Sequence, residues 1–133
     1  MSIDTNAYTA IRRGDAQVFS VLEEADQITM TVIVLGELRA GFASSNREAK
    51  NVRELEEFLE EPYISITPID SETAVHYARI DASLRKVGKA IPTNDQWIAA
   101  LALQHHHALL TFDAHVQRVE GLTCGVTLES LGI

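Results

Sequence analysis

Residues 27–41 read QITMTVIVLGELRAG, and this stretch decides the fold class of the chain. Its first part, residues 27–32, is rich in β-branched side chains and predicts a short strand. The strand leads directly into a helix that carries Glu37, and Gly41 lies near the end of that helix. Strands that alternate with helices in this way are typical of an α/β fold with a parallel sheet.

The same alternation is present before this stretch. Residues 2–4 predict the end of a short first strand, and residues 6–13 predict a helix that stops at Gly14. Asp15 then caps a second helix, whose apolar side consists of Val18, Phe19, Val21 and Leu22. Two helices therefore separate the first two strands.

The segment after Gly41 predicts a further helix and a third strand. Residues 46–60 repeat apolar side chains at near-helical spacing, and we interpret the glutamates of this segment as its solvated face. Pro62 ends the helix, because the residue before a proline is disfavoured in the helical conformation. Residues 63–67 then alternate apolar and polar side chains, as a strand does.

Two helices follow the third strand, joined by a loop over residues 88–93. The first starts near Asp70 or Ser71 and stops at Gly88, and its apolar stripe consists of Tyr77, Ile80, Leu84 and Val87. The second starts near Asn94, and its buried side consists of Trp97, Ile98 and Leu101.

The last part of the chain predicts two more strands, at residues 108–111 and 122–126. The first of these delivers Asp113 at its C-terminal end. No repeat, low-complexity stretch or linker interrupts the 133 residues, so we expect a single domain over residues 1–133. The predicted fold is a three-layer α/β/α sandwich with a mainly parallel central sheet.

The bulk composition is that of an ordinary soluble protein. Hydrophobic residues make up 46% of the chain, and the longest apolar runs, Val32–Leu35 and Ile98–Leu103, are far too short to span a membrane. The N-terminus has no signal-peptide pattern, so we expect a cytoplasmic protein without membrane contact. The single cysteine, Cys124, permits neither an internal disulfide nor a thiolate zinc site.

The net charge of −8 argues at first against nucleic acid as a partner, because binding to phosphate ordinarily needs a basic surface. A site built from four carboxylates would account for half of this charge, and bound Mg²⁺ ions would invert the local field. The acidity also favours a basic protein partner.

Four acidic residues lie where a strand ends or a helix begins: Asp4, Glu37, Asp95 and Asp113. In an open parallel sheet these ends converge on one crevice, where such folds bind ligands. Mg²⁺ prefers oxygen ligands, and a few carboxylates hold it. For a single carboxylate, a helix cap is the simpler interpretation. Glu37 is the least cap-like, because its neighbours are apolar and a carboxylate beside them needs a partner such as a cation.

Four short motifs give a family resemblance. They are IDTN at 3–6, LGELRAG at 35–41, IPTNDQWIAA at 91–100 and LTFDAH at 110–115. Each motif alone is weak evidence, but the four together, in this order and over almost the whole chain, resemble the PIN-domain ribonucleases of the VapC toxin type.

The resemblance implies a catalytic metal site for Mg²⁺ or Mn²⁺ formed by Asp4, Glu37, Asp95 and Asp113. It implies supporting hydrogen bonds from Thr5, Asn6, Asn94 and Thr111. Enzymes of this type cleave RNA with a metal-activated water and leave a 3′-hydroxyl and a 5′-phosphate, so no protein nucleophile is needed. The resemblance also implies a structured RNA substrate such as transfer or ribosomal RNA, a small antitoxin partner and a homodimer.

Some other polar residues are candidates for lesser roles. Arg39 and His115 are possible RNA contacts, because each closely follows one of the four carboxylates. The histidines at 105–107 are adjacent on a helix and point in different directions, so we expect no shared metal ion. Trp97 is expected in the core or at a dimer interface.

Three other functions are rivals to that of a ribonuclease toxin. A haloacid-dehalogenase-like phosphatase also begins with a strand that ends in Asp, but the second residue after Asp4 is Asn6 and not the Asp that such enzymes use. A catalytically silent PIN-like module that binds RNA or protein is open at this point. So is a PIN nuclease that processes RNA as a housekeeping enzyme.

Overall fold

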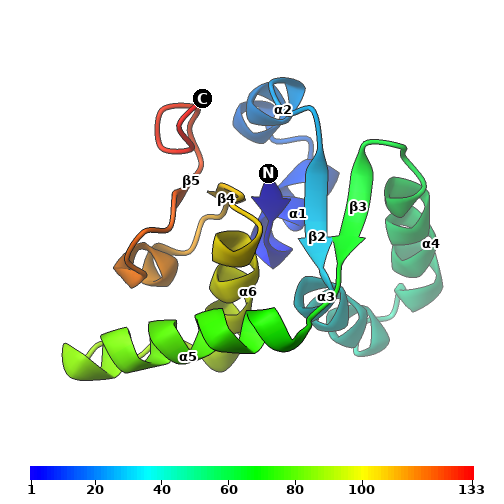
Figure 1. Cartoon of the computed structure of the whole chain (residues 1–133). Helices are drawn as coiled ribbons and strands as arrows, with labels where there is room; N and C mark the ends of the chain where they lie inside the picture. Colours follow the sequence, from blue (N-terminus) through cyan, green and yellow to red (C-terminus); the bar gives the residue numbers. More distant parts are fainter.

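Five short strands form one sheet in the computed structural model, which describes residues 1–133. They are β1 (Ser2–Ile3), β2 (Ile28–Thr31), β3 (Ile64–Thr67), β4 (Leu109–Leu110) and β5 (Cys124–Gly125). Their order in the sheet is β3-β2-β1-β4-β5, and every neighbouring pair is parallel. The prediction of a parallel central sheet is therefore confirmed (Figure 1).

Six α-helices and one short 3₁₀ helix connect the strands. They are α1 (Thr5–Arg12), α2 (Ala16–Glu23), α3 (Val32–Ala43), α4 (Glu48–Leu59), α5 (Ser71–Lys86), α6 (Thr93–Gln104) and the 3₁₀ helix η1 (Ala114–Arg118). Most predicted helix ends lie within two residues of these bounds, but α6 ends at Gln104 although residues 105–107 were predicted to be helical, and η1 was not predicted. Helices cover both faces of the sheet, with α6 in front of it and α1 behind it in Figure 1. The predicted α/β/α sandwich is present.

The middle of the sheet forms the centre of the hydrophobic core. Ile3, Met30, Leu109 and Leu110 come from three neighbouring strands and have no exposed surface. All four residues of β2 are buried. A strand that is covered on both faces needs apolar or β-branched side chains on both, which explains the composition of residues 27–32.

Two apolar side chains that were predicted to face the core are exposed. Phe19 of α2 has 43% of its surface exposed, because Val18 and Val21 already fill the buried side of this short helix. Val87 is 63% exposed, because α5 ends at Lys86 and Val87 lies just beyond the last residue of the helix. Trp97 is half-buried and stacks on Tyr77, with 4.0 Å between the ring centroids.

The segments that follow three of the strands all lie at the carboxyl edge of the sheet. Because all the strands are parallel, the residues that follow β1, β2 and β4 emerge at the same carboxyl edge. Asp4 caps α1 at this edge by accepting a 2.9 Å hydrogen bond from Ala7 N, and Thr31 caps α3 in the same way. None of the helices has the length and apolar character needed to cross a bilayer.

Candidate active site

The four predicted carboxylates reach the carboxyl edge from four different elements. Asp4 directly follows β1, Asp113 follows β4, Glu37 lies in the helix that starts after β2, and Asp95 lies in the first turn of α6. Their negative charges act on one another, since the charges of the other three all raise the pKa of Asp95. The fold thus gathers carboxylates that are more than ninety residues apart in sequence.

Asp4 is the buried member of the group. One carboxyl oxygen, Oδ1, caps α1, and the other, Oδ2, accepts a hydrogen bond from the Thr111 hydroxyl. Burial raises the pKa of Asp4, these two hydrogen bonds oppose the shift, and the charges of Asp113 and Glu37 add to it. A single carboxylate therefore caps a helix and also belongs to the acidic cluster.

Two of the predicted supporting residues contact the carboxylates. The buried Thr111 hydroxyl donates to Asp4 and accepts a 3.0 Å hydrogen bond from Asp113 N, so it links two members of the cluster. Thr5 Oγ1 donates to Glu37 Oε1 at 2.9 Å. The side chains of Asn6 and Asn94 are exposed and are not among the residues that hydrogen-bond to the carboxylates.

Asp95 has the most perturbed carboxyl group of the cluster. Burial, a hydrogen bond with Asp113 and repulsion from Asp113, Glu37 and Asp4 together raise the pKa of Asp95 to about 6. Asp95 does not cap α6, because the N-cap position is held by Pro92, which has no side-chain cap. The carboxylate therefore faces its neighbours and not the helix terminus.

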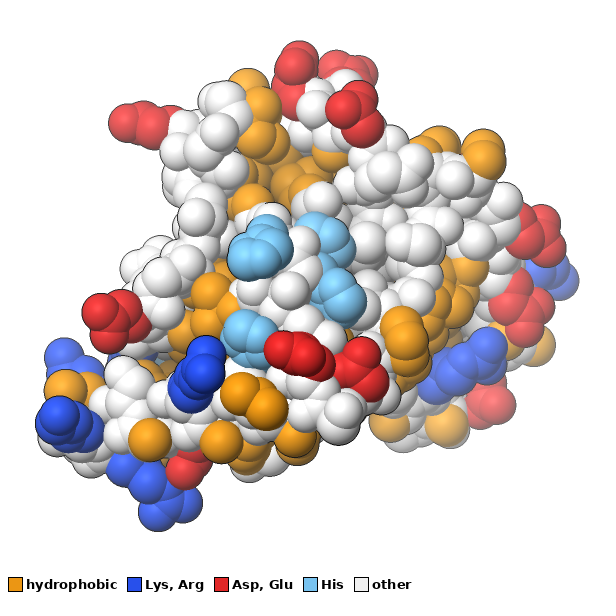
Figure 2. Space-filling view, viewed as in Figure 1, with side chains coloured by type: hydrophobic (Ala, Val, Ile, Leu, Met, Phe, Trp, Pro, Cys, Tyr) orange, Lys and Arg blue, Asp and Glu red, His pale blue; other side chains and the backbone are white.

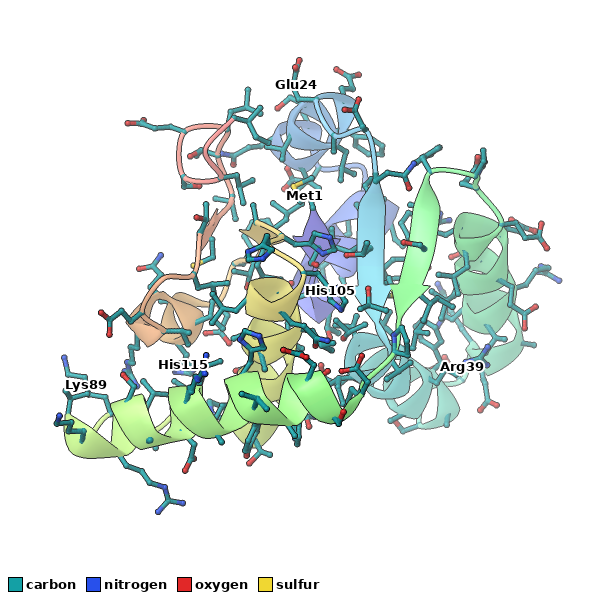
Figure 3. The ribbon with its side chains drawn as sticks, in the orientation of Figure 1. Met1, Glu24, Arg39, Lys89, His105 and His115 are labelled. Atoms are coloured by element: carbon teal, nitrogen blue, oxygen red, sulfur yellow. The ribbon has the colours of Figure 1, made fainter.

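His115 joins the cluster, whereas Arg39 does not. The His115 ring nitrogen Nδ1 lies 3.1 Å from Asp113 Oδ1, and His115 N donates to the same oxygen at 2.8 Å. Arg39 instead pairs with Glu56 of α4 at 3.8 Å, far from His115 in Figure 3. Residues two apart on a helix point to nearly opposite sides, so the closeness of Arg39 to Glu37 in sequence does not bring their side chains together.

The chain matches one known protein family over most of its length. The family model described as PIN domain matches residues 1–122. The chain belongs to the PIN domain family. It is 34% identical over 123 residues to Ribonuclease VapC1 of Rickettsia felis, an alignment that covers 90% of this chain and 90% of the relative.

Solved structures share the same PIN fold. VapBC2 of Rickettsia felis, solved bound to a DNA fragment from its promoter, gives a TM-score of 0.83 at 25% identity over 92% of this chain and 95% of the other. VapBC-5 of Mycobacterium tuberculosis, a member of the VapBC family of toxin–antitoxin systems, gives 0.65 at 26% identity over 77% and 82%. This PIN-domain chain is thus a nuclease of the VapC type, and the phosphatase alternative is excluded.

The donor set of this PIN domain fits a hard divalent cation. Carboxyl oxygens of Asp95 and Asp113 and a ring nitrogen of His115 all lie within 4.8 Å of one another. Burial and repulsion among the carboxylates raise the pKa of Asp95, and a bound cation would relieve the repulsion. PIN nucleases generally use a divalent metal, and these residues can hold one.

Gln96 is a buried residue of the site region that the sequence interpretation missed. Its Nε2 donates a 3.0 Å hydrogen bond to Asp81 Oδ1 of α5, which fixes the first turn of α6, and with it Asp95, against α5. Gln96 lies three and four residues before Ala99 and Ala100, which are buried against α5. That spacing is the sequence signal that could have revealed its burial.

The histidines at 105–107 lie differently from the prediction. Helix α6 ends at Gln104, and His106 has a positive φ of 55°, so the chain reverses there. As a result the rings of His105 and His107 stack with 5.7 Å between their centroids. His107 Nδ1 lies within hydrogen-bond distance of the Ser2 and Thr29 hydroxyls, at 3.1 and 3.2 Å. Histidine side chains gather on the face shown in Figure 2, but these three form no group that could hold one ion.

Proposed function

We propose that this protein is a metal-dependent endoribonuclease and the toxin of a toxin–antitoxin pair. One observation carries the proposal: carboxylates from four separate elements lie near enough at one edge of the sheet that burial and the charges of the other three together raise the pKa of Asp95 to about 6. Such a concentration of negative charge at a partly buried position is costly unless a cation joins it. The similarity to a protein named Ribonuclease VapC1 supports RNA as the substrate.

In this proposal the four carboxylates hold Mg²⁺, with Mn²⁺ as an alternative, because both ions accept carboxylate oxygens. A bound ion would supply a water of lowered pKa and positive charge to offset the charge that develops on the phosphate. The chain itself orients the ligands, since Thr111 holds Asp4 and the backbone of Asp113, and Thr5 holds Glu37. His115, half-exposed beside Asp113, is placed to contact RNA next to the bond that is cut.

A groove between α1, α2 and α4 supports an antitoxin as the protein partner. It is lined by apolar and aromatic side chains, by four glutamates and by one arginine, which are Ile11, Phe19, Leu22, Ala25, Ile28, Phe58, Tyr63, Glu23, Glu54, Glu57, Glu61 and Arg12. The arginine pairs with Glu54, so negative charge is in excess. An amphipathic segment with basic residues would complement such a surface in shape and charge. We place this toxin in the cytoplasm, with a structured RNA such as transfer or ribosomal RNA as its target.

The decisive experiment expresses the wild type and Glu37→Gln in a regulated host. Glu37 lies within α3 and caps nothing, so the substitution removes a ligand charge and leaves the helix intact. We expect the wild type to arrest growth and to create discrete RNA ends with 5′-phosphates, and Glu37→Gln to lower the cleavage rate by about a hundredfold or more. Glu60→Gln, an exposed glutamate of similar chemistry at the end of α4, is the matched control and should behave like the wild type.

The same experiment separates the two alternatives. Purified, folded wild type that cuts no RNA with either metal would favour a silent binding module. Cleavage without growth arrest would favour a housekeeping nuclease.

A further inference from the structure

The positive charges of the second half of the chain gather at one place. After Arg53 the chain has five lysines and arginines, which are Arg79, Arg85, Lys86, Lys89 and Arg118. Four belong to α5 and the turn after it, and the fifth ends η1. Figure 2 shows Lys and Arg side chains gathered where α5 projects from the molecule, and Figure 3 places Lys89 at that tip. We call these five residues the basic end.

Most of the basic end is not neutralised within the chain. Only Arg85 forms an ion pair, with Asp81 at 2.6 Å. In the first half, Arg12, Arg39 and Lys50 pair with glutamates of α4, and the remaining three arginines there form no ion pair. Glu120 is the one further acidic side chain in the groove beside the basic end. Four cations of the basic end are therefore free to bind an external anion.

Two of these cations line the same groove. Arg79 of α5 and Arg118 of η1 face it together with the His76 imidazole and the Ser83 hydroxyl. Arg118 Nη1 also donates to the carbonyl oxygen of Ala90 at 3.2 Å, which orients the guanidinium and ties η1 to the loop after α5. Arginine, histidine and hydroxyl donors in one groove are groups that contact phosphate oxygens in nucleic-acid complexes.

The basic end adjoins the acidic cluster through two short elements. Helix η1 starts directly after Asp113, and its five residues rise roughly 10 Å to Arg118. The hydrogen bond between Gln96 and Asp81 fixes α5 beside the turn that carries Asp95, and Lys86 lies about 8 Å further along the same helix. A nucleic-acid strand can therefore run from the carboxylates to the basic end within a few nucleotides.

We propose that the basic end binds the sugar–phosphate backbone of the RNA substrate on one side of the cleavage site. The proposal rests on the proposed ribonuclease function. The carboxylates repel RNA in the absence of metal, so the affinity for RNA has to come from cations elsewhere. Contacts to phosphates position a substrate without reading its sequence, and they release counterions, which makes binding depend on salt.

The test compares two variants of the full-length protein that each lose two positive charges. Lys86→Gln/Lys89→Gln alters the basic end, and Lys50→Gln/Arg53→Gln alters exposed positions on α4, where the net charge changes by the same amount. Binding of fluorescently labelled mixed transfer RNA is measured by anisotropy in EDTA, so that nothing is cut. We expect the first variant to bind about three- to tenfold more weakly, with the slope of log K against log salt reduced by about 0.7 to 0.9 per lost contact. The control should match the wild type.

Each outcome decides the proposal. Equal affinities for the wild type and both variants, or equal losses in both variants, would overturn it, because the location of the charge would then not matter. Lys86 and Lys89 make no hydrogen bond or ion pair with other side chains, and unchanged melting temperatures would show that folding is intact. Arg79→Gln is a second variant that should weaken binding in the same direction.

The result is also separable from the ribonuclease proposal. Wild type that cuts RNA, with Lys86→Gln/Lys89→Gln binding like the control, would overturn the role of the basic end and leave the nuclease in place. Wild type that binds RNA through the basic end but never cuts it would support the role of the basic end and overturn the ribonuclease function.

Discussion

At the scale of single residues, the site depends on groups that serve two purposes. Asp4 caps a helix and faces the carboxylate cluster, and Thr111 holds both Asp4 and the backbone of Asp113. A buried hydroxyl that links two ligands fixes their positions before any ion binds, and such outer contacts commonly change metal affinity when they are lost. The threonine is therefore part of the site although it carries no charge.

Asp95 gives a prediction about pH and stability. Its pKa is raised from 3.8 to about 6 in the folded protein, so the folded state binds the proton more tightly than the unfolded state does. The stability that this group contributes is present below pH 4, falls as the pH rises toward 6, and is absent above pH 6. In metal-free protein at pH 7.5 we expect Asp95→Asn to raise the free energy of unfolding by about 1 kcal/mol, after allowance for solvent screening.

Thermal melts at pH 4.5 and 7.5, with EDTA or Mg²⁺, check this prediction. In EDTA at pH 7.5 the variant should melt about 4 °C above the wild type. Mg²⁺ should stabilise the wild type more than the variant, and less at pH 4.5, where protons compete for the carboxylate. A variant that is less stable than the wild type in EDTA at pH 7.5 would show that Asp95 makes a structural contact and does not suffer net repulsion.

Some of these residues could be predicted from the sequence and others could not. Asp4 and Asp113 follow strands and Asp95 lies in the first turn of a helix, and that placement is visible without coordinates, whereas Glu37 lies within α3, in its second turn. The contacts of Thr111 with Asp4 and of Gln96 with Asp81 depend on how β4 lies beside β1 and α6 beside α5. Such contacts between distant segments cannot be predicted from the local pattern of residues in the sequence. The pairing of Arg39 with Glu56 was missed for the same reason.

At the scale of elements, the strands that carry the site are only two residues long. β1, β4 and β5 have two residues each, so little strand sequence holds this half of the sheet. Backbone hydrogen bonds next to the strands add support, including the 3.0 Å bond from Thr111 N to the carbonyl oxygen of Gly125 in β5. The position of β5 therefore affects the threonine that contacts Asp4.

Gly125 is the element-scale test of this dependence. Its φ is +152°, and an added Cβ would lie 2.2 Å from Ser130 Oγ and 2.6 Å from Ser130 Cβ. We expect Gly125→Ala to lower the free energy of unfolding by about 2–3 kcal/mol, because both backbone strain and a clash oppose the side chain. Gly121→Ala is the control, since its φ is +82° but nothing lies within 4 Å of the added atom. It should cost only about 1 kcal/mol, the strain alone.

Urea unfolding of both variants measures the difference. Equal losses would mean that the turn containing Ser130 moves freely and that β5 is not held by it. A larger loss in Gly125→Ala, accompanied by weaker metal binding, would connect this edge of the sheet to the acidic cluster.

The order of helices and strands could be predicted from the sequence, because each element has a regular spacing of apolar residues and is bounded by residues that end helices or strands. Gly14 and Gly88 each lie two residues after the helix end that the structure shows, and Pro62 lies three residues after the end of α4. The exposure of Phe19 and Val87 could not be predicted from the sequence. Periodicity shows which side chains share a helix face, but not whether another element covers that face. Phe19 faces the groove between α1, α2 and α4 and no buried layer.

At the scale of the whole molecule, the charges are divided between two regions. Glu54 and Glu57 of α4 line the groove that supports the antitoxin proposal, whereas the basic end lies on α5, the turn after it and η1. A net charge of −8 hides this division, which is why composition alone argued against nucleic acid. One protein can thus present an acidic surface to a basic partner and a basic surface to RNA.

The homodimer expected from the family resemblance gives the last prediction. Val32, Ile66, Ile69 and Val75 have between 38% and 47% of their surface exposed, and they lie around the carboxyl ends of β2 and β3 and the start of α5. The register of these strands, with Thr31 beside Thr67, brings the following residues together. Exposed apolar side chains that lie close together are typical of an interface. We expect this patch to be buried between two copies of the chain.

Ile69→Asp/Val75→Asp should therefore convert a dimer into a 14.7 kDa monomer, because two carboxylates at the centre of an apolar interface would lose their hydration on association. Light scattering coupled to gel filtration measures the mass at micromolar concentration. Phe19→Asp is the control, because this phenylalanine is equally exposed but lies in the groove on α2, so the dimer should persist. A wild type that is already monomeric, or a dimer that survives the double substitution, would place any self-association on another face. The acidic cluster would then have to cut RNA without residues from a second copy beside it.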